Sequence, residues 1–171
     1  MLPIQILLNN FLYDLSQVAI PADNVDDDWL KKPRRWNLDF VKKFMYFFGP
    51  VSSMFDFLTF FILLAVFAAP ESVFQTGWFV ESLATQVLVV HIIRTRKIPF
   101  VQSRAGKYLL AGTFAAVAAG WIIPFTPLGG FFGFQPLPLP LALALAGISA
   151  TYLVVAEIAK RIFYRRHFEM F

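Results

Sequence analysis

Five long apolar segments, separated by short polar connections, constrain this chain more than any other feature of its sequence. The segments are Leu2–Ile20, Val51–Ala69, Phe74–Ile93, Tyr108–Phe125 and Leu139–Ile162. Each is close to the ~17–25 residues that a helix needs to cross the hydrocarbon core of a bilayer. Because backbone groups in that core must be satisfied within the segment, each one is expected to be helical. The sequence therefore predicts an all-α membrane protein with five transmembrane helices.

The basic residues indicate how these helices are oriented. All 15 Lys and Arg either follow the first or third segment or lie at the end of the fifth segment and beyond it, and none lies in the connections 69–74 and 126–138. Lys and Arg in short connections stay on the cytoplasmic side of a membrane. We therefore expect the N-terminus outside and the C-terminus in the cytoplasm, and we interpret the net charge of +4 as a topology signal with no nucleic-acid partner. The three groups are Lys31, Lys32, Arg34, Arg35, Lys42 and Lys43; Arg94, Arg96, Lys97, Arg104 and Lys107; and Lys160, Arg161, Arg165 and Arg166.

The first apolar segment contains an amide and a carboxylate, Asn10 and Asp14, four residues apart. This spacing places both side chains on one face of a helix. A carboxylate near the centre of a bilayer costs about 2.5–3.5 kcal/mol on insertion scales, so it is expected to face protein, water or an ion. Two interpretations remain open: oxygen ligands for a hard cation such as Mg²⁺, or polar contacts to a neighbouring helix.

Three other polar residues lie within the second and third segments. Asp56 falls in the first two turns of the second segment, where the positive end of a helix stabilises a carboxylate. Glu81 is expected near the external end of the third segment, within reach of headgroups or water. Gln86 lies deeper, and we expect it to bond a neighbouring helix more readily than an ion.

The remaining polar features of the segments predict structural roles. His91 is expected at the cytoplasmic boundary of the membrane, where an imidazole needs no special function. Glu157 precedes Lys160 and Arg161 by three and four residues, a spacing that predicts ion pairs on a helix surface. The connection 126–138 is rich in proline and glycine and is predicted to lack regular structure.

Motifs for nucleotide or metal chemistry are absent from the sequence. It contains no G-x-x-x-x-G-K-[ST], G-x-G-x-x-G or H-E-x-x-H pattern. It also contains no cysteine, which excludes disulfides and thiolate metal sites within the chain. We therefore expect no catalytic residues and no ATPase activity from this chain alone.

Three long stretches carry a family resemblance: LPIQILLNNFLYDLSQVAIPADNVDDDWLKKPRRW, FGPVSSMFDFLTF and FQTGWFVESLATQVLVVHIIRTRKIPFVQSR. They closely resemble the C-terminal membrane half of bacterial P-type ATPases of the magnesium-importing class. The resemblance extends over nearly the whole chain. It implies one membrane domain over residues 1–171, corresponding to the sixth to tenth transmembrane helices of such a pump, in the bacterial inner membrane.

The resemblance also implies roles for individual residues. The family's sixth-helix pattern of Asn, three residues and Asp falls on Asn10 and Asp14, which would supply oxygen ligands to the transported cation. Tyr13 stands where calcium-pump relatives carry a hydroxyl ligand, and Gln86 where they carry a Glu. Both are thus possible further ligands, although these departures argue against a second site of the calcium-pump type.

By the same resemblance, Mg²⁺ is the transported ion and ATP acts only through domains that this chain lacks. The phosphorylated D-K-T-G-T motif of the family is not in the sequence, nor are the nucleotide-binding, phosphorylation and actuator domains. The implied partners are membrane lipids and the remaining N-terminal part of a pump. The alternative interpretation is a small non-enzymatic membrane protein that associates with an intact pump or with another helix bundle.

Overall fold

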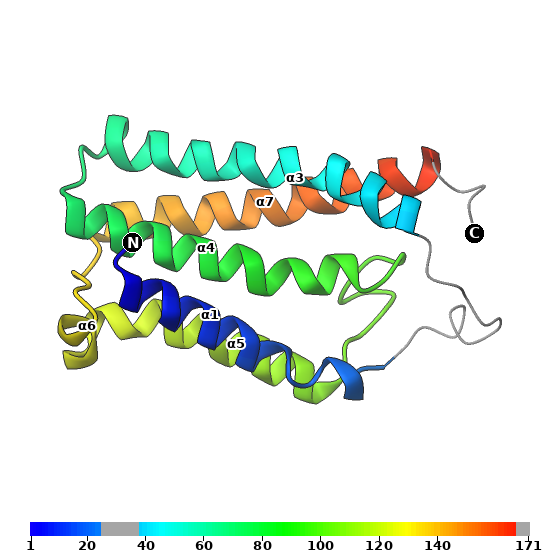
Figure 1. Cartoon of the computed structure of the whole chain (residues 1–171), viewed down its shortest axis with the longest axis horizontal. Helices are drawn as coiled ribbons and strands as arrows, with labels where there is room; N and C mark the ends of the chain where they lie inside the picture. The colour runs from blue at the N-terminus through cyan, green and yellow to red at the C-terminus, as the bar shows by residue number, and fades with distance from the viewer. Residues whose placement is uncertain (25–37, 167–171) are drawn as a thin grey trace.

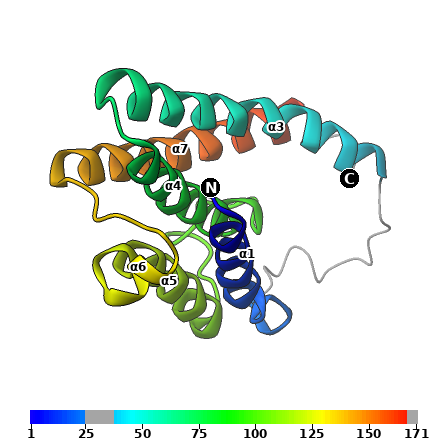
Figure 2. The same ribbon diagram turned by 60° about the vertical axis from the view of Figure 1, so that its left-hand side comes forward.

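The structure, a computed structural model, describes residues 1–24 and 38–166, and this described part contains helices and no β-strand. The all-α prediction is therefore confirmed for these residues. The long helices run from one end of the bundle to the other in Figure 1, and Figure 2 shows α1 inclined to α3 and α7. The helices are α1 (Pro3–Gln17), α3 (Leu38–Phe61, continued by a π-helical turn at Ile62–Val66), α4 (Glu71–Ile93), α5 (Lys107–Ile122), α6 (Pro127–Phe131) and α7 (Leu139–Arg166).

Four helical stretches in the described residues are long and apolar enough to cross a membrane. They are Leu38–Val66, Glu71–Ile93, Lys107–Phe125 and Leu139–Arg166. The helix α1 has 15 residues and is shorter than the predicted segment Leu2–Ile20. The α-helix ends at Gln17 because the chain turns into a short 3₁₀ helix at Ile20–Ala22, which contains Pro21.

The helix α3 begins well before the predicted segment Val51–Ala69. Pro50, directly before the predicted segment, lies inside this helix, so the prediction that the helix starts at Val51 is wrong. A proline in a helix interior removes one backbone hydrogen bond, which membrane helices tolerate when neighbouring groups compensate. Aromatic packing also favours the continuous helix, because Phe44 stacks on Phe48 with ring centroids 4.1 Å apart and both contact Phe163 of α7.

The connection 126–138 also differs from the prediction of no regular structure, because residues Pro127–Phe131 form the short helix α6. Gly129 makes this turn possible. A Cβ atom at this position would lie 2.7 Å from the carbonyl oxygen of Ile123 and 2.9 Å from that of Pro124. Only glycine allows the backbone to approach itself so closely.

The helix α4 occupies the centre of the bundle. It contacts α1, α3, α5 and α7, and Figure 2 shows it between the pair α3 and α7 and the pair α1 and α5. In its most apolar window 67% of the residues are buried, against 11% for α3. Side chains of α4 and α7 pack together in the main core. They include Phe79, Leu83 and Val87 of α4 and Leu141 and Leu145 of α7.

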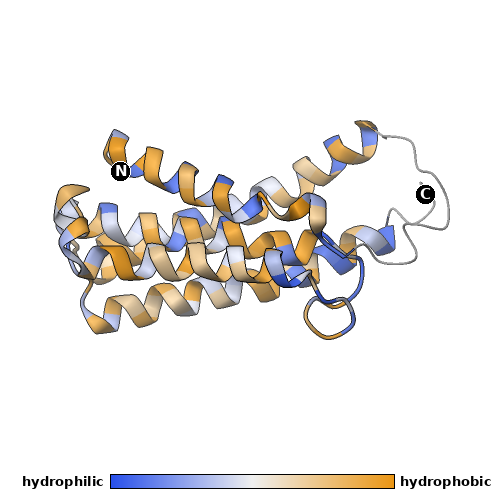
Figure 3. Cartoon of the chain, turned by 90° about the horizontal axis from the view of Figure 1, so that it is seen from below, coloured by the Kyte–Doolittle hydropathy of each residue, from blue (hydrophilic) through white to orange (hydrophobic). Residues whose placement is uncertain are grey.

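The two ends of the bundle differ in charge. The N-terminus, the turn between α3 and α4, and α6 lie at one end, whereas the start of α3, the connection 94–106 and the end of α7 lie at the other (Figure 1). The basic residues of the described part all belong to this second end, where hydrophilic residues gather in Figure 3. The basic residues between 31 and 35 lie outside the described residues.

Candidate functional site

The helix α1 has a buried stripe and an opposite exposed face. Asn10 and Asp14 lie together on the exposed face, as the four-residue spacing predicts. The structure therefore directs this pair away from the helices that it describes. The buried positions repeat every three or four residues, which is the pattern of one side of a helix packed on a bundle. They are Gln5, Asn9, Leu12 and Ser16.

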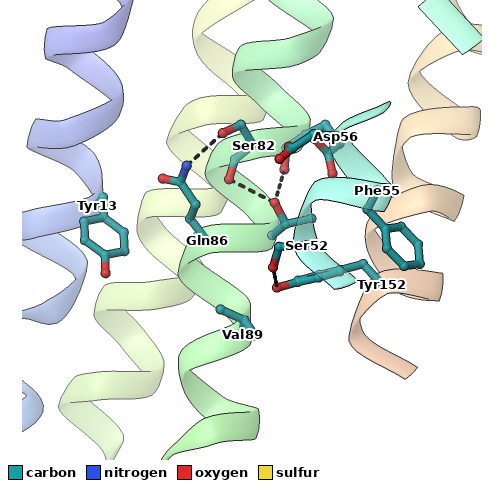
Figure 4. Close-up of a pocket in the computed structure, with 10 residues that line it drawn as sticks. Tyr13, Ser52, Phe55, Asp56, Ser82, Gln86, Val89 and Tyr152 are labelled. Carbon is teal, nitrogen blue, oxygen red and sulfur yellow. Dashed lines mark hydrogen bonds between the residues drawn. The ribbon is translucent and has the colours of Figure 1, made fainter. Parts of the chain in front are cut away.

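A chain of amide hydrogen bonds connects α1 to α4. Asn9 Nδ2 donates to Gln86 Oε1 over 3.3 Å, and Gln86 Nε2 donates to Ser82 Oγ over 2.9 Å. The prediction that Gln86 bonds a neighbouring helix is therefore confirmed. Figure 4 shows the amide of Gln86 directed toward Ser82, and Tyr13 of α1 lies on the other side of Gln86 from Ser82.

These residues border a polar cavity of about 300 Å³ between α1, α3, α4 and α7. Hydroxyl groups from two helices meet there, because Ser52 of α3 and Tyr152 of α7 are hydrogen-bonded over 2.9 Å (Figure 4). Oxygen-bearing side chains thus reach the cavity from every helix that surrounds it. The residues that line it are Tyr13, Ser52, Phe55, Asp56, Glu81, Ser82, Thr85, Gln86, Val89 and Tyr152.

Two carboxylates of this cavity were misplaced by sequence reasoning. Because α3 begins at Leu38, Asp56 lies far from the helix start, and the prediction that it caps the first turns is wrong. The expectation that Glu81 reaches headgroups or water is also wrong, because its side chain is 1% exposed and lies in the interior of α4's packed surface. The aromatic residues that precede Gly49 were the available signal for an earlier start of α3.

An ion pair fixes the end of α1 against the connection between α4 and α5. Arg94 Nε lies 2.6 Å from Asp23 Oδ2, and Arg94 Nη2 donates to the carbonyl oxygen of Asn24 over 2.7 Å. Asp23 Oδ1 accepts a hydrogen bond of 2.6 Å from the backbone N–H of Gly106. The segment that follows α1 is therefore bonded to the end of α4 and to the start of α5.

His91 is buried between helices. Its side chain is 1% exposed, and its Nε2 is hydrogen-bonded to Thr113 Oγ1 of α5 over 2.8 Å. His91 lies in the last turn of α4, and α5 packs over this part of the helix, so the imidazole is enclosed by protein. The contact gives His91 a role in holding α4 and α5 together.

The ion pairs predicted for Glu157 are confirmed, with 2.6 Å to Lys160 Nζ and 2.9 Å to Arg161 Nε. Lys160 is nevertheless not a surface residue, because it is 0% exposed. Its ammonium group donates to the carbonyl oxygens of Ile92 and Lys97 over 3.2 and 3.0 Å. It thereby satisfies a carbonyl at the C-terminal end of α4, where a cation also interacts favourably with the helix dipole.

Within the ranges 1–24 and 38–166, no group of three or more His, Cys, Asp or Glu residues could hold a metal ion. A cation site that uses the residues of this chain would therefore combine one or two carboxylates with amide and hydroxyl oxygens. Mg²⁺ fits such a donor set, because it prefers oxygen ligands and retains several waters. Among the described residues, Asn10 with Asp14 and the oxygens of the cavity meet this description.

Comparisons with known proteins identify the relatives of the chain. Residues 1–162 match the family described as "Cation transporting ATPase, C-terminus". The chain is 47% identical over 171 residues to the "Magnesium-transporting ATPase, P-type 1" of Escherichia coli (strain K12) and to a protein of that name from Salmonella typhimurium (strain LT2). A second protein of that name from the same Salmonella strain is 43% identical over 175 residues. The matches cover 98 to 100% of this chain but 19% of each relative, so the chain spans about a fifth of their length.

Proposed function

The chain belongs to the family of cation-transporting ATPase C-terminal regions, and from this membership we propose that it is the C-terminal membrane domain of a Mg²⁺-translocating P-type pump in the bacterial inner membrane. It supplies Asn10 and Asp14 to the intramembrane site for the transported cation. The observation that carries this proposal is the shared exposed face of the two residues on α1. A carboxylate within a membrane needs a cation or a polar partner. Asp14 is exposed and is not packed against the other described helices.

The topology that we propose has five crossings, with the N-terminus outside and the C-terminus in the cytoplasm. The gathering of basic residues at one end of the bundle supports this orientation. At 1.5 Å per residue, α1 alone is about 22 Å long, which is less than the ~30 Å hydrocarbon core. The 3₁₀ helix at Ile20–Ala22 extends the crossing, and tilt or local thinning of the bilayer accommodates the rest.

Tyr13 and Gln86 are the further oxygen donors that we propose near the cation site. Tyr13 is half-buried on α1 next to Asp14, and Gln86 faces α1 from α4. The carbonyl oxygen of Gln86 accepts one hydrogen bond from Asn9, which leaves it a second lone pair for a cation or a water. The remaining ligands of the site would come from helices outside this chain.

The partner that we propose is therefore the rest of the pump, through which ATP hydrolysis drives transport. The low burial of α3 and the exposed face of α1 support a partner that covers both helices. The relatives' much greater length supports the same partner. The alternative is a separate protein that associates with an intact pump. In that case the chain would co-purify with a complete pump, and replacing Asp14 of the chain would not change Mg²⁺ uptake by that pump.

The test is Mg²⁺ uptake by cells whose pump contains this region with Asp14→Asn, a change that keeps the shape of the side chain and removes its charge. We expect uptake to fall at least about tenfold while the amount of pump protein is unchanged. Mutating residues that only hydrogen-bond a metal ligand typically lowers metal affinity or activity about 10–100-fold, and the loss of a direct ligand should cost at least as much. Ser16→Ala is the matched control on the buried face of α1, where the hydroxyl bonds only the carbonyl of Tyr13. Normal uptake by the Asp14→Asn pump would refute the proposal.

A further inference from the structure

We propose that the cavity between α3, α4 and α7 is a second hard-cation site, in which Asp56 and Glu81 bind a divalent cation of the Mg²⁺ type that keeps part of its water shell. This site goes beyond the one that uses Asn10 and Asp14, because its carboxylates come from α3 and α4. It also differs from the calcium-pump pattern, which would place ligands at Tyr13 and Gln86.

The first observation is an unsatisfied carboxylate that lines the cavity. Glu81 is 1% exposed, and its Oε2 has no hydrogen-bond partner among the described residues. Thr59 of α3 is completely buried beside this carboxylate and is the polar group that its oxygen can reach, although the two do not meet hydrogen-bond geometry. A single neighbouring hydroxyl does not replace the hydration of a buried carboxylate, so the native state is expected to supply a cation or a proton.

The second observation is the charge balance of the cavity. Asp56 of α3 and Glu81 of α4 both line the cavity. Among the described residues that line the cavity, none is Lys, Arg or His. The cavity is therefore lined by two acidic side chains and, among the described residues, by no basic one, and one divalent cation would balance the charge of both carboxylates.

The third observation is the set of neutral oxygens and the space around them. The hydroxyls of Ser52 and Tyr152 form one bonded pair, and Ser82 Oγ accepts from Gln86, so each keeps lone-pair capacity for a water or an ion. A cavity of about 300 Å³ has room for several waters at ~30 Å³ each. Mg²⁺ is commonly held by one or two carboxylates and retains its other waters, whereas Ca²⁺ takes six to eight oxygen ligands.

The position of the cavity connects it to the first site. Tyr13 of α1 lines it, and the hydrogen bonds from Asn9 through Gln86 to Ser82 run from α1 to its edge. A cation bound there would attract Asp56 of α3 and Glu81 of α4 at once. It would thereby stabilise the contact of the weakly buried α3 with the central helix.

The experiment titrates the full chain in lipid nanodiscs with Mn²⁺ and follows the electron paramagnetic resonance signal of free Mn²⁺, with Mg²⁺ as competitor. We expect Glu81→Gln and Asp56→Asn each to weaken Mn²⁺ binding about tenfold or more. Glu71→Gln is the matched control, because Glu71 is an exposed carboxylate of the same helix that bonds only Gln75 among the described residues. All titrations use chains that also carry Asp14→Asn, which removes the carboxylate of the site of the proposed function, so that the remaining Mn²⁺ binding reports the cavity.

Asp56 is exposed in the chain, so its neutralisation is not expected to disturb folding, and far-UV circular dichroism checks the helix content of each variant. If Glu81→Gln does not fold, Asp56→Asn decides the question. Equal Mn²⁺ affinity with and without Asp56→Asn would overturn the proposal. A chain with both cavity carboxylates that binds no Mn²⁺ at millimolar concentration would also overturn it. If that chain takes up one proton more than Glu81→Gln, the two carboxylates share a proton in place of a cation.

Discussion

Replacing Asp23 with Asn should loosen the junction of α1 with α4 and α5 while it leaves the helices themselves formed. The substitution keeps the size of the side chain and a carbonyl oxygen that can still accept from the N–H of Gly106. It removes the negative charge that faces Arg94 Nε at 2.6 Å. The junction lies where the chain leaves α1, so it controls how firmly the helix that carries Asp14 is held.

The burial of the pair sets the magnitude of the effect. The side chains of Arg94 and Asp23 are 10% and 12% exposed. Breaking a fully buried pair costs about 3–5 kcal/mol, whereas an exposed pair contributes about 0.2–1 kcal/mol. Arg94 keeps its bonds to the carbonyl of Asn24 and to Ser103 Oγ, at 2.7 and 3.2 Å, so it is not left without partners. We therefore expect a loss of about 2 kcal/mol in the stability of the junction.

Amide hydrogen exchange of the chain in nanodiscs measures this loss locally. At 1.4 kcal/mol per factor of ten, about 2 kcal/mol corresponds to exchange on the order of 30-fold faster near the end of α1. The amides of α7 should be unaffected, and Glu71→Gln serves as the control for removal of an exposed carboxylate. Unchanged exchange around Asp23, or an equal increase throughout α7, would refute the reasoning.

Two further predictions concern the packing that holds the bundle together. Lys160→Met should destabilise the chain by about 2–3 kcal/mol because it removes buried charge-assisted hydrogen bonds, whereas Arg161→Met, at a side chain 54% exposed, should change it by less than about 0.5 kcal/mol. Equal shifts of the thermal midpoint for the two variants in detergent would contradict this. Gly129→Ala should cost about 1–3 kcal/mol, since its Cβ would meet backbone carbonyls, and Gly130→Ala, which meets no atom within 4 Å, should be nearly neutral. Similar midpoints for the two alanine variants would show that the turn relaxes.

The local features of the molecule were predictable from its sequence. The apolar segments identified the helices, and the spacing of Asn10 and Asp14 placed both residues on one face of α1. The bond of Gln86 to α1 and the ion pairs of Glu157 were also predicted correctly. These features depend on helical periodicity and on residues close together in the sequence, which is why a single sequence is sufficient for them.

The errors arose where contacts between distant segments decide the outcome. The apolar segment predicted a helix start at Val51, but packing of the aromatic residues before Pro50 on Phe163 continues α3 through the proline. That shift changed the position of Asp56 within its helix. The burial of Glu81 follows from α4 being surrounded by other helices, and Lys160 is buried because its ammonium reaches carbonyls at the far end of α4. No local pattern in the sequence contains this information.

The central claim is that Asp14 faces the interior of a pump rather than lipid, and spin labelling tests it most directly. The chain has no cysteine, so Asp14→Cys introduces a single attachment site in this region, with Val154→Cys as the reference at an exposed apolar position of α7. The measurement compares relaxation of the two labels by lipid-dissolved oxygen in an intact pump whose other cysteines have been replaced. The account predicts strong relaxation and free motion at position 154, and weak relaxation with restricted motion at position 14. Equal oxygen relaxation and equal mobility at the two positions would contradict it.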